Sequence, residues 1–185
     1  MILNIPTLLT LFRLLIIPII IAVFFADLAH DNLILFGLFL LAASSDWLDG
    51  YLARNLNQVT RFGSFLDPVA DKILVSISLI LLLSEDPNKI FTFAVIIIVA
   101  REIIISGLRE WMSKVGESDK VNITFLGKLK TALQMFGISF MFYRLPLFGV
   151  DVYHIGMILI ILATMLTIWS MINYFIGSWS ALKKQ

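Results

Sequence analysis

The sequence contains no cysteine among its 185 residues, and only 15% of them are charged. The absence of cysteine excludes disulfide bonds, thiolate catalysis and cysteine-based metal sites. Hydrophobic residues make up 59% of the chain, whereas soluble domains have about 45–50%. A soluble protein of this length could not bury so much apolar surface in one core, so the composition indicates a membrane protein. The formal net charge of +1 gives no sign of a nucleic-acid partner.

Long apolar runs account for most of the chain. A membrane-spanning helix needs roughly 20 apolar residues. About six segments meet this requirement, at 8–26, 33–54, 64–84, 88–113, 124–146 and 152–180. The connectors are short, and no internal repeat or second domain is evident. We therefore expect residues 1–185 to form a single all-α integral membrane domain, a bundle of about six transmembrane helices.

The basic residues orient this bundle. If both termini and the connectors after the second and fourth runs are cytoplasmic, only Lys89 and Arg144 of the 14 lysines and arginines lie outside. Cytoplasmic segments of membrane proteins carry such an excess of positive charge. The sequence therefore predicts cytoplasmic N- and C-termini. Arg13 lies near the middle of the first run, where a lipid-facing arginine would be costly.

Four aspartates lie within one stretch, DWLDGYLARNLNQVTRFGSFLDPVAD at 46–71. Asp46 and Asp49 are three residues apart, and Asp67 and Asp71 are four apart, so each pair shares one face of a helix. The connector between the two helices folds the second back beside the first. Because each carboxylate at the centre of a bilayer costs about 2.5–3.5 kcal/mol, we expect the four to lie near the interface, paired or bound to metal.

Aspartate oxygens suit a hard cation such as Mg²⁺ or Mn²⁺. Four carboxylates would balance two divalent ions, and paired ions of this kind clamp the attacking and leaving oxygens of a phosphoryl displacement. Gly50 and Ala53 leave room for a ligand against the helix, and Arg54 is suited to bind a phosphate. A structural alternative remains open, in which the aspartates are solvated or paired with Arg54, Arg61 and Lys72, and the small residues only pack helices.

The same stretch fits the pattern D-x-x-D-G-x-x-A-R-x(8)-G-x-x-x-D-x-x-x-D without a departure. This pattern resembles the signature of the CDP-alcohol phosphotransferases. The segments NIPTLLTLFR at 4–13, VTRFGSFLDPVADK at 59–72, AREIIISGLREWM at 100–112 and GKLKTALQM at 127–135 are most similar to bacterial members that use glycerol 3-phosphate. The resemblance implies transfer of the phosphatidyl group from CDP-diacylglycerol to sn-glycerol 3-phosphate, giving phosphatidylglycerophosphate and CMP.

The resemblance also implies roles for individual residues. Two divalent cations, Mg²⁺ or Mn²⁺, would be held by Asp46, Asp49, Asp67 and Asp71, and Asp71 would also be the catalytic base. The CDP-lipid would be bound by Asp49, Gly50, Ala53, Arg54 and Gly63. The resemblance further implies a homodimer in the bacterial inner membrane, with a multi-pass chain and an active site that faces the cytoplasm.

The phosphate of the acceptor requires cationic partners. We expect these among the basic residues of the fourth and fifth runs, with one hydroxyl donor: Arg101, Arg109, Lys128, Lys130 and Thr131. An ordinary positive flank of cytoplasmic helix ends would give a similar pattern. Local ion pairs with Glu102 and Glu110 would account for part of it.

Three alternative functions remain open from the sequence. An enzyme of the same family could use another alcohol acceptor, such as serine, inositol phosphate or a second phosphatidylglycerol. A divalent-cation transporter would also carry intramembrane acids, although we expect a transporter to place them at several depths along a pore. A structural membrane scaffold would give no reason for four ordered aspartates.

Overall fold

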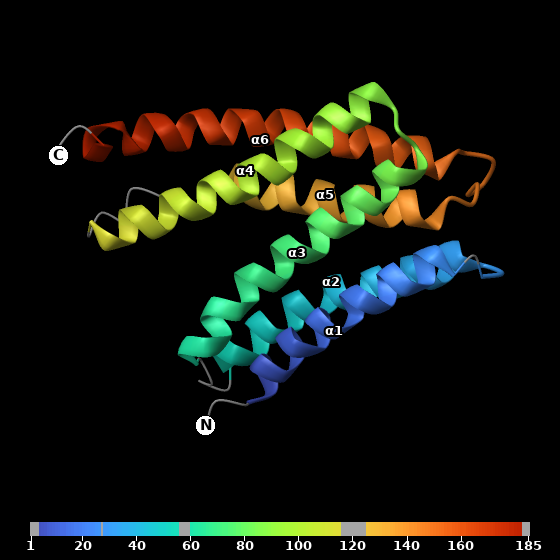
Figure 1. Cartoon of the computed structure of the whole chain (residues 1–185), viewed down its shortest axis with the longest axis horizontal. Helices are drawn as coiled ribbons and strands as arrows, with labels where there is room; N and C mark the ends of the chain where they lie inside the picture. The colour runs from blue at the N-terminus through green and yellow to red at the C-terminus, as the bar shows by residue number, and fades with distance from the viewer. Residues whose placement is uncertain (1–3, 27, 56–59, 116–124, 183–185) are drawn as a thin grey trace.

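The computed structural model describes residues 4–26, 28–55, 60–115 and 125–182. Within these ranges the protein is helical apart from short connectors, and six helices follow one another along the chain (Figure 1). Their bounds are α1 Ile5–Phe25, α2 Asp31–Asn55, α3 Arg61–Glu85, α4 Lys89–Lys114, α5 Phe125–Tyr143 and α6 Val152–Leu182. The prediction of an all-α protein is confirmed.

Polar residues at the ends of the apolar runs fix where the helices begin. The side chain of Asn4 accepts a hydrogen bond from the backbone N–H of Thr7 at 3.1 Å, at the start of α1. Asn88 accepts from the N–H of Ile90 at 2.9 Å, at the start of α4, and Thr60 caps α3 in the same way. These side chains satisfy N–H groups that have no partner within the helix.

The helices pack as two hairpins joined by a diagonal helix. α1 packs on α2 and α5 on α6, while α2 also contacts α5 and α4 contacts α6. α3 crosses between them and contacts α1, α4 and α5 (Figure 1). Both termini lie at one end of the bundle, and the connectors α1–α2, α3–α4 and α5–α6 lie at the other.

The apolar residues divide between a buried core and an exposed outer surface. Phe39, Phe91 and Phe142 are fully buried, whereas Phe93 is 65% exposed and Ile103 is 69% exposed. So much exposed apolar side chain would be unfavourable in water. It is the surface that a protein presents to lipid.

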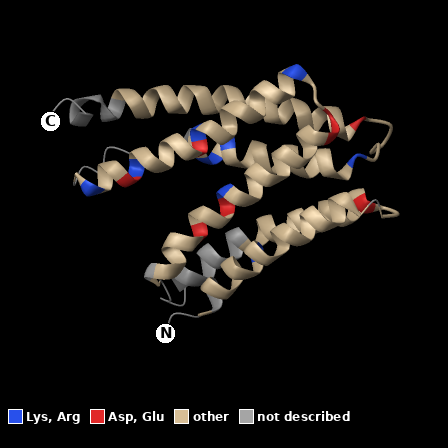
Figure 2. Ribbon diagram, in the orientation of Figure 1, with Lys and Arg blue, Asp and Glu red and all other residues tan. Residues whose placement is uncertain are grey.

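Three of the helical segments are long and apolar enough to cross a membrane among the described residues: Thr7–Phe25, Lys89–Lys114 and Val152–Ile176. Asp31–Ser45 is a shorter apolar helix. The protein is therefore a helical membrane protein, and the expectation of about six spans stays a prediction. The charged residues interrupt the apolar surface mainly on α3 and α4 and at the connector end (Figure 2).

At the connector end, polar contacts join the α5–α6 hairpin to α3 and to the α3–α4 connector. Arg144 forms an ion pair with Glu85, and the hydroxyl of Tyr153 donates a hydrogen bond to Asp86 Oδ2 at 2.9 Å. The first joins the end of α5 to α3, and the second joins α6 to the α3–α4 connector. These contacts stabilise the packing at the connector end of the bundle, opposite the end where the two termini lie.

Candidate active site

The four aspartates of the motif lie on two helices that contact each other. Asp46 and Asp49 are in the last turns of α2, and Asp67 and Asp71 are one turn apart in α3. The side chains of residues 46–55 lie outside the described part, so the opposition of the two pairs across the hairpin stays a prediction. Among the side chains that are described, no three potential metal ligands come together. The same range contains four of the five expected CDP-lipid positions, Asp49, Gly50, Ala53 and Arg54.

Arg13 joins the two aspartate-bearing helices from α1. Its side chain is fully buried, and its Nη1 lies 3.3 Å from Asp67 Oδ1. Its Nε donates to the hydroxyl of Ser45, the residue before Asp46, at 3.5 Å. The expectation that Arg13 avoids lipid is confirmed. The side chain of Asp67 is still 42% exposed, so this ion pair leaves its carboxylate accessible to a cation.

Gly63 lies where the first turn of α3 approaches the start of α1. A Cβ atom at this position would be 2.9 Å from Thr60 Oγ1 and 3.0 Å from Thr7 Oγ1. Real Cβ atoms rarely come so close to other atoms, so a side chain here would displace the cap of α3. The structure thus gives Gly63 a packing role, beside the contact with the CDP-lipid that the sequence predicts.

A polar cavity of about 220 Å³ lies between α3, α4, α5 and α6. It would hold roughly seven water molecules at the volume each has in the liquid. Its lining includes Asp71 together with four of the five residues expected to bind the acceptor phosphate: Arg101, Arg109, Lys130 and Thr131. The fifth, Lys128, is exposed and does not line this cavity. The last aspartate of the motif and the basic residues of two other helices therefore share one chamber.

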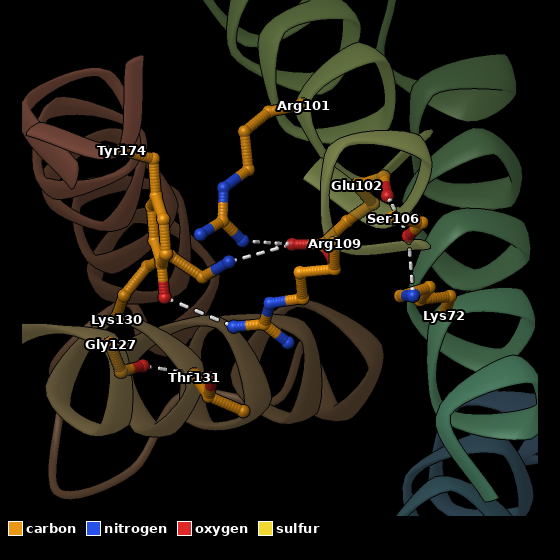
Figure 3. A network of polar contacts seen from close by, with 9 residues as sticks. All are labelled: Lys72, Arg101, Glu102, Ser106, Arg109, Gly127, Lys130, Thr131 and Tyr174. Carbon is orange, nitrogen blue, oxygen red and sulfur yellow. Dashed lines mark hydrogen bonds and ion pairs between the residues drawn. The ribbon is translucent and has the colours of Figure 1, made fainter. Parts of the chain in front are cut away.

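Glu102 organises the basic side of the cavity (Figure 3). Its Oε1 accepts from Arg101 Nη1 at 2.7 Å and from Lys130 Nζ at 2.6 Å. The Arg101 and Lys130 side chains are only 8% and 4% exposed. Buried charges need partners of opposite sign, and Glu102 provides one carboxylate for both.

Tyr174 brings α6 to the same site (Figure 3). Arg109 Nη2 donates to its hydroxyl at 3.0 Å. The guanidinium carbon of Arg109 lies 5.6 Å from the centre of the ring, and that of Arg101 lies 6.0 Å from it. Both distances are within the range of a cation–π interaction. Tyr174 was not predicted from the sequence, because the face of the last helix that meets α4 depends on tertiary packing.

Lys72, the residue after Asp71, connects α3 to α4. Its Nζ donates to Ser106 Oγ at 2.5 Å, and this hydroxyl in turn donates to the backbone carbonyl of Glu102. Lys72 also lines the cavity. The described contact directs its ammonium group to Ser106 of α4, a residue outside the lining of this cavity.

The charges that line the cavity favour an anion. Four cationic side chains stand against two carboxylates, Asp71 and Glu102, which leaves an excess of two positive charges. A phosphate monoester carries about −1.5 to −2 at pH 7. Charge complementarity of this kind favours a phosphorylated ligand over a neutral one.

A carboxylate motif beside a basic chamber, within a bundle of apolar helices, is the arrangement of a membrane enzyme that handles phosphorylated substrates. A family model, CDP-alcohol phosphatidyltransferase, matches residues 3–169. The chain belongs to this family.

Curated relatives of the chain match along almost its whole length. It is 44% identical over 171 residues to the CDP-diacylglycerol--glycerol-3-phosphate 3-phosphatidyltransferases of Salmonella choleraesuis (strain SC-B67) and Escherichia coli (strain K12). In both comparisons the match covers 92% of this chain and 92% of the relative.

Proposed function

We propose that the protein transfers the phosphatidyl group of CDP-diacylglycerol to sn-glycerol 3-phosphate, forming phosphatidylglycerophosphate and releasing CMP. Membership of the family and the activity named for its 44%-identical relatives support this function. The observation that carries the choice of acceptor is the cavity, because Asp71 lies there beside Arg101, Arg109 and Lys130. A phosphorylated alcohol suits such a chamber better than a neutral alcohol.

Members of the family generally use divalent cations. The donor set fits such ions, since it consists of four carboxylates near one end of the bundle and two of them, Asp67 and Asp71, lie one turn apart. We propose that Asp46, Asp49, Asp67 and Asp71 hold two ions, Mg²⁺ or Mn²⁺. When bound, these ions would offset the negative charge that develops on the transferred phosphoryl group.

We propose that Asp71 acts as the base. In the proposed reaction it accepts the proton of the primary hydroxyl of glycerol 3-phosphate. That oxygen forms a bond to the phosphorus that carries diacylglycerol, and the bond from this phosphorus to the oxygen bridging it to CMP breaks. The released CMP keeps the bridging oxygen. Asp71 lines the cavity in which the acceptor would be held, so the hydroxyl and its base would start close together.

The acceptor phosphate would be bound on the opposite wall. Arg101 and Lys130 are held toward the cavity by their common partner Glu102, and Arg109 is held by Tyr174. Arginine and lysine held in place in this way bind phosphate without losing further side-chain freedom. The hydroxyl of Thr131 would add a neutral donor.

The same proposal includes the position of the CDP-lipid, the orientation in the membrane and the homodimer. The CDP-lipid would lie against the end of α2, at Asp49, Gly50, Ala53 and Arg54, with Gly63 at the start of α3. The active site would face the cytoplasm from a bacterial inner membrane, as the distribution of basic residues supports. A homodimer is supported by the family resemblance.

Product analysis with a panel of acceptors tests this function. Purified protein in detergent micelles receives CDP-diacylglycerol, Mg²⁺ and one acceptor: glycerol 3-phosphate, glycerol, serine, inositol or inositol phosphate. We expect CMP and phosphatidylglycerophosphate with glycerol 3-phosphate alone, and no product after chelation of the metal. Transfer to another acceptor would refute the substrate assignment. No transfer by folded protein to any acceptor would favour a cation transporter.

A further inference from the structure

Gln134 lies in the wall of the cavity next to the proposed phosphate-binding residues. It follows Lys130 by one turn of α5, and with Gly127 and Thr131 these residues have the spacing of a single helix face. All four line the cavity. Gln134 is only 3% exposed, so its side chain is almost wholly buried beside the cavity.

The amide nitrogen of Gln134 has no hydrogen-bond partner within the described part of the chain. Nearly all buried donors in folded proteins have a partner, because an unpaired buried donor loses its bond to water without compensation. Arg101 Nε, in the same lining, also has none among the described residues. Both donors belong to residues that line one cavity, so an acceptor oxygen of a ligand bound there would give such a donor a partner.

The chemistry of the amide distinguishes Gln134 from its neighbours. Lys130, Arg101 and Arg109 can neutralise a phosphate, whereas an uncharged amide cannot. A hydroxyl group suits an amide, because its oxygen accepts a hydrogen bond from the NH₂ group. Glycerol 3-phosphate has two hydroxyls, and only the primary one reacts. The hydroxyl on its middle carbon needs a hydrogen-bond partner when the acceptor is buried in the cavity.

We infer that Gln134 donates a hydrogen bond to the middle hydroxyl of the acceptor and thereby selects a glycerol phosphate. This inference rests on the proposed function. Gln134 would hold the middle carbon while the cations hold the phosphate. Together these contacts direct the primary hydroxyl toward Asp71. Sites with a buried polar group reject analogues that lack its partner, because the group is then left unpaired.

A substrate analogue without the middle hydroxyl, 3-hydroxypropyl phosphate, tests the inference. The wild-type protein should prefer glycerol 3-phosphate to this analogue by roughly ten- to a hundredfold in kcat/KM. In Gln134→Met, which keeps the length of the side chain but removes the amide, kcat/KM for glycerol 3-phosphate should fall by a similar factor. The value for the analogue should stay unchanged, so the preference disappears.

Two controls separate a contact with the substrate from a structural role. Gln134→Met should unfold at the same temperature as the wild type or higher without substrate, because the amide nitrogen it removes has no described partner. Thr167→Val, in α6, also removes a buried hydroxyl without a described partner, at a position outside the cavity lining. This variant should keep the full preference for glycerol 3-phosphate. Gln134→Leu provides a second apolar variant if the Met variant does not fold.

Equal losses with both acceptors would overturn the inference, since the amide would then act on the phosphate or on the fold. An unchanged preference in the variants would also overturn it. A wild-type protein that does not use glycerol 3-phosphate would refute the proposed function itself. That result would be visible before any variant is made.

Discussion

Glu102 illustrates how single residues set the chemistry of the site. It is the described carboxylate partner of both Arg101 and Lys130, whose side chains are only 8% and 4% exposed. Removal of one partner from a buried ion pair leaves an uncompensated charge and is strongly destabilising. The proposed acceptor site therefore depends on an acid, although the ligand proposed for it is an anion.

The role proposed for Asp71 predicts the effect of removing its negative charge. Asp71→Asn keeps the shape of the side chain but cannot accept a proton, so CMP release should fall by about a hundredfold or more. Initial rates at saturating acceptor measure this loss. Asp151→Asn, an exposed aspartate at the connector end, should retain the wild-type rate. Activity near the wild-type level in Asp71→Asn would rule out the proposed base.

Lys128 and Lys130 offer a matched pair for testing the acceptor site. Lys130 lines the cavity, and Lys128 is exposed outside its lining two residues away. Lys130→Met should raise KM for glycerol 3-phosphate by roughly ten- to a hundredfold, the value of a hydrogen bond to a charged group. KM for CDP-diacylglycerol should change little, and Lys128→Met should leave both constants unaltered. Equal effects of the two substitutions would indicate a general effect of positive charge.

Most of the residues expected at the site were predictable from the sequence, but the residues that contact them were not. The motif placed Asp67 and Asp71 one turn apart, and the structure brings Asp71 together with Arg101, Arg109 and Lys130. Lys128 was indistinguishable from Lys130 in the sequence, because which side of α5 faces α4 depends on packing. Tyr174 and Gln134 were missed for the same reason. An acid adjacent to Arg101 in an apolar run was the available signal for Glu102.

The helices α5 and α6 pack closely against each other at two glycines, Gly137 and Gly156. A Cβ atom on Gly156 would lie 2.7 Å from the backbone oxygen of Gly137, and a Cβ on Gly137 would lie 2.8 Å from Ile160 Cδ1. Small residues allow helix backbones to come together in membranes, where packing is a main source of helix association. This contact holds α6, and with it Tyr174, against the rest of the bundle.

Gly156→Ala should therefore destabilise the protein. The added methyl group meets backbone, which cannot move aside easily, and overpacking of this kind costs about 1–3 kcal/mol. Thermal unfolding in detergent measures the change. Gly37→Ala in α2 is the control, because no atom lies within 4 Å of its Cβ position, and alanine is favoured over glycine in a helix by about 0.5–1 kcal/mol. A stabilised Gly156→Ala would contradict the close contact of α5 and α6.

The helices themselves could be predicted from the sequence, but which helices pack against each other could not. Each expected run corresponds to one helix because apolar stretches of this length end at capping residues such as Asn88 and Thr60. The diagonal course of α3 and the packing of α4 on α6 depend on side chains that meet across the bundle. No local pattern encodes these pairings.

At the scale of the whole molecule, the cavity and the ion pair of the connector end lie in different parts of the bundle. The cavity contains residues of α3, α4, α5 and α6, whereas Glu85 and Arg144 pair at the connector end. Both termini lie at one end of the bundle. Composition was enough to predict an all-α membrane protein, and the distribution of basic residues predicts its orientation.

The absence of cysteine makes the orientation directly testable. His30→Cys introduces one thiol at an exposed position of the α1–α2 connector. Lys114→Cys introduces one at the last residue of α4, at the end of the bundle where the termini lie, and the native side chain there is 72% exposed. In intact spheroplasts, a membrane-impermeant maleimide should label His30→Cys. Lys114→Cys should react only after permeabilisation. The reverse pattern would mean that the termini are not cytoplasmic.

The central claim is that the primary hydroxyl of glycerol 3-phosphate attacks the lipid phosphorus directly. Its most direct test uses glycerol 3-phosphate with ¹⁸O in that hydroxyl, followed by mass spectrometry of both products. Our account predicts that the label is retained in the new phosphodiester of phosphatidylglycerophosphate and that CMP is unlabelled. Lipid product without the label, or CMP released without any new lipid, would contradict it.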